Sequence, residues 1–213
     1  MKVLMINGSP NEKGCTYTAL SEVATELKRL GINSEILWLG KKVMQDCIAC
    51  NKCRQLKRCV FDDLVNKTAG RLSEFSGLIV GSPVYYGGST GIVRSFLNRL
   101  FYSTLDEVKL NASALNGMPA AAVVSCRRGG ASMTFAQLNM YFEMQRMTQV
   151  CSQYWNQVHG HTPEEVRNDE EGMQTMRTLA QNMAWLIKSA KLADENGLGR
   201  PAYEDFKPTN FIR

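Results

Sequence analysis

The stretch that decides the fold is KVLMIN at residues 2–7, followed directly by GSPNEKGCT at residues 8–16. The apolar run is of the kind that forms a strand buried on both faces of a sheet. Beyond the loop, apolar residues recur at helical spacing, at Leu20, Val23, Ala24, Leu27 and Leu30. A strand, a small polar loop and a helix in succession place the positive N-terminal end of the helix at the loop. The sequence therefore predicts an anion site here.

The loop supplies groups suited to a single phosphate. Gly8 and Gly14 let the backbone approach closely, and hydroxyl, amide and thiol side chains add donors, at Ser9, Asn11, Cys15 and Thr16. The alternative is an ordinary strand–helix turn with an N-cap. A phosphatase-like nucleophile at Cys15 would need an arginine closing the same loop, and residues 16–21 contain none. We therefore expect a phosphate to be bound without being cleaved.

The rest of the chain repeats the strand–helix pattern. Further apolar runs typical of strands occupy residues 34–39, 77–81, 118–125 and 148–152. Five such units predict a doubly wound, five-stranded parallel sheet with helices on both faces. Glycine-bearing loops follow three of the strands, at residues 8–16, 82–88 and 126–131. Because the carboxyl ends of parallel strands meet at one sheet edge, where ligands bind, we expect these loops to converge on one site.

Chain length favours one large domain, predicted over residues 1–193, with residues 194–213 as an extended, polar C-terminal tail. The last long helix carries a methionine-rich stripe, interpreted as core or subunit interface, at Met173, Met176, Leu179, Met183 and Leu186. These features predict no internal repeat and no second folded domain.

Composition narrows the function classes. Hydrophobic residues make up 44% and charged residues 21% of the chain, and the net charge of +5 is not concentrated in one run, which disfavours nucleic acid as a partner. No apolar stretch approaches the ~20 residues of a membrane span, and the N-terminus lacks a signal-peptide pattern. We expect a cytoplasmic protein with no membrane partner.

Seven cysteines in that compartment favour thiol, metal or redox chemistry over structural disulfides.

The three loops together describe a mononucleotide site. The first loop suits one phosphate and lacks G-x-G-x-x-G, which disfavours a dinucleotide as the main cofactor. The second loop offers backbone N–H groups and the rings of Tyr85 and Tyr86, and the third adds the charges of Arg127 and Arg128. Amides at a flavin edge and positive charge near its N1 would stabilise the reduced anion. FMN is therefore the expected cofactor. Taken one at a time, the two tyrosines and the two arginines could equally be ordinary surface residues.

These motifs resemble the flavodoxin-like NAD(P)H-dependent FMN reductases, a group that includes the iron–sulfur flavoproteins. The resemblance covers roughly nine-tenths of the chain and implies a flavodoxin-like fold, FMN as cofactor and NAD(P)H as transient electron donor. It places the FMN phosphate at the first loop and the isoalloxazine ring over the second and third. The predicted cofactor-binding residues are Ser9, Pro10, Asn11, Gly14, Cys15, Thr16, Pro83, Val84, Tyr85, Tyr86, Gly87, Ser125, Arg127, Arg128, Gly129 and Gly130. Relatives commonly carry Asn or another polar residue where this chain has Cys15.

A second candidate site is the cysteine segment, with Cys47, Cys50, Cys53 and Cys59 within thirteen residues. The C-x2-C-x2-C spacing resembles the ferredoxin run, and in the iron–sulfur flavoproteins it is the motif for a [4Fe–4S] cluster. The ferredoxin run ends in Cys-Pro, whereas here Val60 follows, and cluster-free FMN reductases also retain cysteines in this place. A zinc site made of four cysteines usually has two separated pairs. Cluster and no cluster both stay open.

Positive charge crowds this segment at Lys52, Arg54, Lys57 and Arg58. These side chains are expected to offset the charge of a thiolate-bound cluster and to lower the pKa of nearby thiols. The same charges also suit an acidic partner or a soluble loop. If a cluster is present, we expect it at the subunit surface beside the FMN loops.

The predicted function is an FMN-dependent oxidoreductase of the NAD(P)H-dependent flavin or quinone reductase type, with a small-molecule electron acceptor or a redox protein as partner. No catalytic residue is predicted, because hydride chemistry at a flavin needs no protein nucleophile. The first alternative is a non-enzymatic electron carrier, and the second is a nucleotide-binding regulatory module. Aromatic and methionine-rich surfaces predict a homodimer or homotetramer with the flavin near a subunit boundary, at Tyr85, Tyr86, Phe101 and Tyr102.

Overall fold

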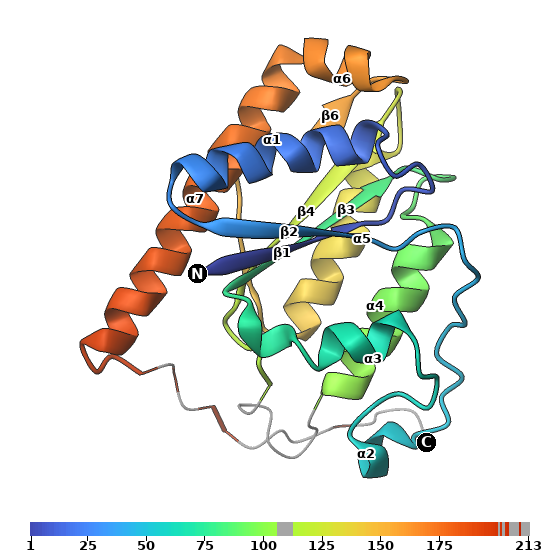
Figure 1. Ribbon diagram of the computed structural model, residues 1–213, viewed down its shortest axis with the longest axis vertical. Coiled ribbons are helices and arrows are strands. Elements are labelled where there is room, and N and C mark those ends of the chain that lie inside the picture. Colours follow the sequence, from blue (N-terminus) through green and yellow to red (C-terminus); the bar gives the residue numbers. More distant parts are fainter. Residues whose placement is uncertain (106–112, 200, 202, 205–208, 210–213) are drawn as a thin grey trace.

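The computed structural model describes residues 1–105, 113–199, 201, 203, 204 and 209, and shows one parallel sheet between two layers of helices (Figure 1). The strands are β1 (Lys2–Asn7), β2 (Asn33–Trp38), β3 (Gly77–Pro83), β4 (Pro119–Cys126), β5 (Thr148–Gln149) and β6 (Gln157–His159). The helices are α1 (Cys15–Arg29), α2 (Cys53–Leu56), α3 (Leu64–Ala69), α4 (Gly91–Thr104), α5 (Ala131–Met144), α6 (Pro163–Asn168) and α7 (Glu170–Glu195), with a 3-10 turn, η1 (Leu72–Glu74).

The central strands are apolar because both of their faces are covered. β4 is buried along its whole length, and β3 is buried except at Pro83. The strand order is β2-β1-β3-β4-β5, with all pairs parallel. The chain winds in opposite directions from β1, so the order reverses between β1 and β3, which is where ligands bind in such sheets. The predicted doubly wound, flavodoxin-like fold is confirmed.

The fifth strand position differs from the prediction. Instead of one strand at residues 148–152, two short strands share the outer edge of β4: β5 pairs with Pro119 and Ala120, and β6 pairs with Val124 to Cys126. The connecting segment carries Tyr154 and Trp155, which are both exposed. The apolar run around Val150 predicted a continuous strand, but it ends where the chain turns away from the sheet.

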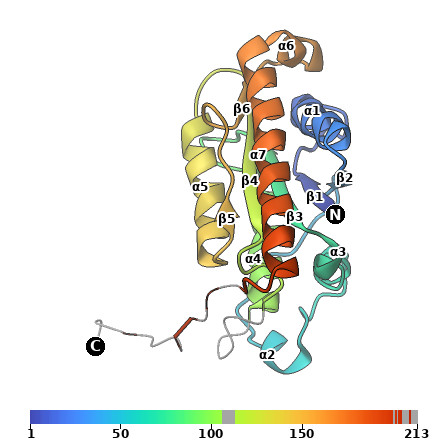
Figure 2. The ribbon, with the colours of Figure 1, turned by 90° about the vertical axis from the view of Figure 1, so that its left-hand side faces the viewer.

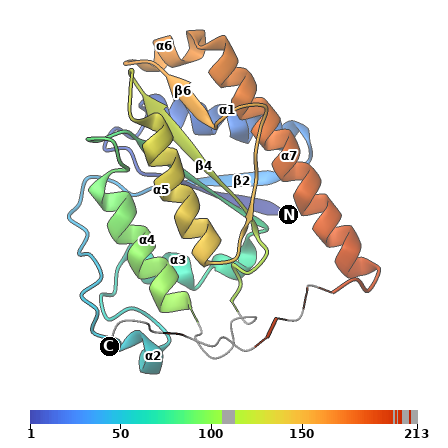
Figure 3. The same ribbon diagram turned by 180° about the vertical axis from the view of Figure 1, so that it is seen from behind.

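Two apolar layers hold the helices on the sheet. α1 and α7 pack together on one face of the sheet. In Figure 1, α1 lies in front of the strands. α3, α4 and α5 cover the other face, and Figure 3 shows α4 and α5 in front of the strands. The methionine stripe of α7 lies in the first layer, where Met176 and Met183 are fully buried. The stripe was interpreted as either core or subunit interface, and for these residues the core interpretation is correct.

α7 runs the length of the molecule beside α1 (Figure 2) and ends at Glu195, two residues beyond the predicted domain boundary at 193. Much of the predicted tail, namely residues 200, 202, 205–208 and 210–213, lies outside the described residues. Within the residues that are described, none of the helices combines the length and the apolar character needed to cross a membrane.

Candidate functional site

The loops that follow β1, β3 and β4 meet at the carboxyl edge of the sheet, as predicted. Gly8 N–H donates to the Gly81 carbonyl at 2.9 Å, and Val84 N–H donates to the Ser125 carbonyl at 3.1 Å. The Thr90 hydroxyl, at the start of α4, donates to the Gly8 carbonyl at 2.9 Å. These bonds join the first loop to the second and the second to the third.

The first loop is organised by Asn7, the last residue of β1. Its side-chain amide donates to the Glu12 carbonyl at 3.0 Å, and its Oδ1 accepts from the Ser9 N–H at 3.1 Å. The Ser9 hydroxyl oxygen in turn accepts from the Asn11 N–H at 3.1 Å. Asn7 is fully buried, so these bonds fix the loop from within. The sequence pattern predicts Asn7 only as a strand residue, although an amide at the end of an apolar strand is a signal for such a role.

The N-terminus of α1 fits a bound anion. Its N-cap is Gly14, and among the described residues no side chain caps the helix and no acidic residue occupies the first turn. The N–H groups of that turn, in a helix of 15 residues, therefore keep their capacity for a negative group. A Cβ at Gly14 would lie 3.0 Å from the Asn11 Cβ, so the loop closes tightly only with glycine there.

Two predicted phosphate ligands, Thr16 and Cys15, already have protein partners. The hydroxyls of Thr16 and Ser125 lie 2.8 Å apart, and Thr16 is 1% exposed. A hydroxyl has one proton and two lone pairs, so this bond leaves capacity for a ligand. The Cys15 thiol donates to the Gly160 carbonyl at 3.7 Å, and burial raises its pKa. Cys15 is therefore a packed thiol, which agrees with the exclusion of a nucleophilic role.

The second loop is a tight turn that presents two tyrosines. Tyr85 and Gly88 exchange backbone hydrogen bonds at 2.8 and 3.1 Å. The residues between them, Tyr86 and Gly87, have φ values of 51° and 77°, as in the type I′ hairpin turn. Tyr86 is fully exposed and Tyr85 is half exposed. The turn therefore holds both rings out from the sheet edge.

The third loop packs against the second. Gly130 has a φ of 87°, and a Cβ there would lie 2.8 Å from Val84 Cγ1 and 3.2 Å from the Gly87 Cα. Arg127, Arg128 and Gly129 are exposed beside it. Gly130 is also the N-cap of α5, and within the described part of the chain that helix start has no side-chain cap. The loop thus offers backbone N–H groups and two guanidinium groups at the same edge.

The end of β2 and the loop after β6 also reach this edge, and neither was among the predicted site residues. The Trp38 indole N–H, at the end of β2, donates to the Ser9 carbonyl at 2.8 Å. Gly160, after β6, donates its N–H to the Cys126 carbonyl at 3.1 Å. The predicted strand at residues 34–39 was a signal for Trp38, whereas β6 was not predicted and left no signal for Gly160. Of the two neighbouring histidines, His159 ends β6 and His161 follows it, and both side chains are exposed.

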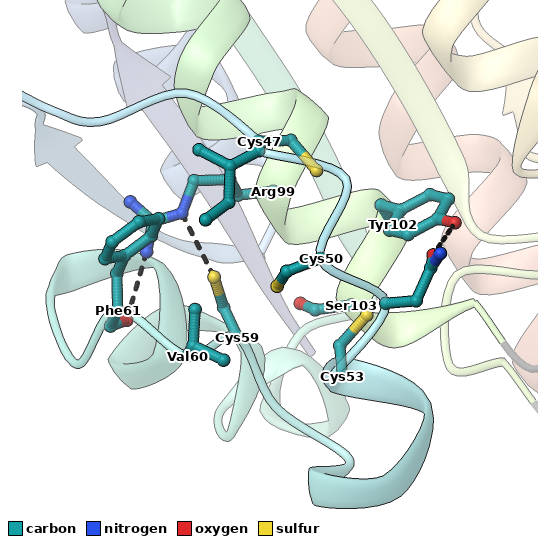
Figure 4. Close-up of a pocket in the computed structure, with 11 residues that line it drawn as sticks. Cys47, Cys50, Cys53, Cys59, Val60, Phe61, Arg99, Tyr102 and Ser103 are labelled. Carbon is teal, nitrogen blue, oxygen red and sulfur yellow. Dashed lines mark hydrogen bonds between the residues drawn. The ribbon is translucent and has the colours of Figure 1, made fainter.

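The four cysteines of the second candidate site line one pocket, together with α4 residues that include Arg99, Tyr102 and Ser103. Figure 4 shows the four sulfur atoms bordering the same hollow, and all four thiols are free. Over the described ranges, no three His, Cys, Asp or Glu side chains lie close enough to hold a single metal ion. The donor set nevertheless fits a cluster, because four thiols around one space are the ligands that such a cluster takes.

The cysteine pocket is not beside the FMN loops. α4 begins at the loops, next to Thr90, and the pocket lies against its later residues, Arg99 to Ser103. Arg99 to Ser103 come 8 to 12 residues after Gly91, which is about 12–18 Å along the helix. The prediction that the cysteines adjoin the sheet-edge site is therefore wrong within one chain. The prediction on thiol pKa also fails at Cys53, where burial raises the pKa and outweighs the opposing charge of Arg54.

Comparison with known proteins agrees with this geometry. The NADPH-dependent FMN reductase family matches residues 1–162. An iron–sulfur flavoprotein of Methanocaldococcus jannaschii is 29% identical over 197 residues, which cover 90% of this chain and 100% of that protein.

Two solved structures share the fold. RosB, crystallised with a bound 8-demethyl-8-formylriboflavin-5′-phosphate intermediate, superposes with a TM-score of 0.70 at 14% identity, over 100% of this chain and 94% of RosB. A flavodoxin from the domain Archaea gives a TM-score of 0.58 at 14% identity, over 88% of this chain and 99% of the flavodoxin. With a match over three-quarters of its length, the chain belongs to the NADPH-dependent FMN reductase family.

Proposed function

We propose that this flavin oxidoreductase binds FMN at the sheet edge and reduces it with NAD(P)H. The observation that carries the proposal is the uncapped N-terminus of α1, facing a glycine-bearing loop at the point where the strand order reverses. Family membership supports FMN as the cofactor.

The chain's own groups divide the work of binding. The first-turn N–H groups of α1 and the side chains of Ser9, Asn11 and Thr16 would hold the phosphate. The backbone of residues 83–87 and 127–130 would border the ring. Arg127 and Arg128 would place positive charge where the reduced flavin becomes negative. FMN itself supplies the hydride and electron chemistry, so no nucleophilic side chain is required.

We further propose that Cys47, Cys50, Cys53 and Cys59 hold a [4Fe–4S] cluster. Four thiols lining one pocket support this, as does the name of the M. jannaschii relative. A flavin accepts electrons in pairs and a cluster passes them singly, so the two would convert two-electron into one-electron transfer. The electrons would leave to a small-molecule acceptor or a redox protein.

Assembly of several copies is the third part of the proposal. α5 presents exposed methionines along one face, at Met133, Met140 and Met144, and Tyr86 is exposed at the sheet edge. A line of exposed apolar side chains on one helix favours a homo-oligomer. Because the pocket and the FMN loops lie toward opposite ends of α4, transfer within one chain would span much of that helix. Light scattering that gave a 23.8 kDa monomer at micromolar concentration would contradict this part.

Heat release tests the flavin assignment. Protein purified without oxygen should release FMN on heating, and finding FAD, or failing to reconstitute with FMN, would refute the flavin assignment.

Turnover of NADH or NADPH with a quinone separates the enzyme from the second candidate, a non-enzymatic electron carrier. The remote, surface-bordering cysteine pocket favours that second candidate. A pure carrier would react only with its protein partners.

A further inference from the structure

A buried arginine lies behind the cysteine pocket, on the apolar stripe of α4. Arg99 is 1% exposed, between Phe96 and Leu100, which are fully buried. A buried guanidinium needs partners for its charge and its donors, because desolvation is costly. The sequence carried a signal for it, since a charged residue interrupts an otherwise apolar helical stripe.

All five N–H donors of Arg99 are used, and all of them go to the cysteine segment and the residues that flank it. Nε donates to Cys59 Sγ at 3.2 Å. Nη1 donates to the Gln45 carbonyl at 3.2 Å and to Asp63 Oδ2 at 2.6 Å. Nη2 donates to the Phe61 carbonyl at 3.0 Å and to Asp63 Oδ1 at 2.9 Å. One side chain therefore ties the residues before Cys47 to those around and after Cys59.

The segment has little regular structure of its own. It contains only the four residues of α2, and three of its non-glycine residues have positive φ, at Ala49, Asn51 and Lys57. Such a segment has few internal bonds to hold four thiols around one space. Neighbouring α4 residues add two further ties: Asn98 donates to Asp46 Oδ1 at 3.0 Å, and Tyr102 donates to Asn51 Oδ1 at 2.7 Å. Arg99 makes more of these contacts than either neighbour.

We propose that Arg99 is the positioning residue of the four-cysteine pocket: its guanidinium fixes both ends of the segment and donates a hydrogen bond to the Cys59 sulfur. The cluster-related part of this inference rests on the proposed function. When Cys59 ligates a cluster, the same N–H would face a sulfur that becomes more negative on reduction. Hydrogen bonds to cluster sulfurs are among the features that set reduction potentials. Arg99 would therefore raise the potential of the cluster as well as hold its ligand.

The test uses Arg99→Lys in the full-length protein, with Arg94→Lys as the matched control on the exposed side of the same helix. Lysine keeps a charge opposite Asp63 but lacks the five-donor fork. After anaerobic reconstitution with Fe²⁺ and sulfide, Arg99→Lys should bind iron about 10- to 100-fold more weakly. Any cluster it retains should have a more negative midpoint potential in an EPR redox titration. Arg94→Lys should match the wild type in iron binding and in midpoint potential. The FMN content of each variant shows whether it has folded.

Hydrogen exchange of the cluster-free protein keeps the outcomes separable. Backbone amides of residues 45–63 should exchange faster in Arg99→Lys than in the wild type and in Arg94→Lys. If the wild type takes up no iron, the cluster proposal fails. The amide exchange rates of residues 45–63 then test by themselves whether Arg99 holds the segment in place. Unchanged iron binding, potential and exchange in Arg99→Lys would overturn the inference. Should that variant not fold, Arg99→Met with Asp63→Asn removes both charges together and keeps a side-chain oxygen to accept from Val65 N–H at the start of α3, so it is read in the same way.

Discussion

The sheet-edge loops and the cysteine segment are held in place by different means. The loops follow parallel strands, and backbone hydrogen bonds between the strand ends set their positions, as in Gly8 to Gly81. The cysteine segment depends on side chains from elsewhere, above all Arg99 and Asn66, whose amide donates to the Cys59 carbonyl at 2.9 Å. The first site is thus built by the fold itself, whereas the second needs side-chain anchors, and in our proposal a cluster, to complete it.

The largest expected effect comes from removing one proposed cluster ligand. Cys50→Ser should abolish stoichiometric iron after anaerobic reconstitution and leave FMN binding unchanged, because the two sites lie toward opposite ends of α4. Iron and sulfide analysis, with heat-released FMN measured on the same sample, checks both. Cys151→Ser, an exposed cysteine outside the segment, is the control. Wild-type protein that stays free of iron would leave the four cysteines as a thiol-rich loop in a plain FMN reductase.

Backbone geometry at the sheet edge is tested next. Gly130→Ala forces a side chain into a φ of 87°, at 2.8 Å from Val84 Cγ1. A left-handed residue with a Cβ costs about 1–2 kcal/mol, and the close contact adds to this, so FMN affinity should fall about tenfold or more. Gly91→Ala, at the start of α4 and outside the predicted cofactor-binding residues, places a Cβ with nothing within 4 Å and should bind FMN normally. Fluorescence titration of the apoprotein measures both, and equal affinities would mean that the backbone of this loop does not shape the site.

A single donor at the same site should matter less. Thr16→Val removes one phosphate hydrogen bond and leaves the Ser125 hydroxyl without its 2.8 Å partner. A hydrogen bond to a charged group contributes about 1.5–3 kcal/mol. Because the other donors of the loop still hold the phosphate, we expect the lower end of that range, which is about a tenfold rise in the FMN dissociation constant. Thr25→Val makes the same change at an exposed position of the same helix and should have no effect. If the two variants bind FMN alike, Thr16 does not contact the phosphate.

The smallest effect concerns the stability of the sheet, apart from both sites. Hydrogen bonds from Arg71 and Lys2 lower the pKa of Glu35 from 4.5 to about 2. Because the folded pKa is the lower one, this pairing stabilises the fold above pH 4.5, and the contribution is lost as the pH falls toward 2. Glu35→Gln should therefore lower the free energy of unfolding by about 1–2 kcal/mol at pH 7 and hardly at all near pH 2. Urea denaturation at both pH values measures it, and an equal loss at both would reject the ion-pair explanation.

The fold class and the meeting of the three loops could both be predicted from the amino-acid sequence. Both follow from local patterns, because strand and helix periods are visible in a single chain and parallel strands end at one edge. The apolar run of β1 and the glycine-bearing loop after it were enough to place the expected phosphate site. Ser9, Asn11 and Thr16 do lie at that edge, and their ligand contacts stay predictions.

The arrangement of the remaining site residues depends on long-range packing. Asn7 and Trp38 act through bonds to the first loop, and Arg99 reaches Cys59 from forty residues away along the chain. The pocket's distance from the FMN loops depends on which end of α4 the cysteine segment packs against. Contacts between residues far apart in sequence leave no periodic pattern, since they depend on how whole elements pack. The spacing of the four cysteines therefore left a cluster as one of two open interpretations, and it could not predict where in the molecule these thiols lie.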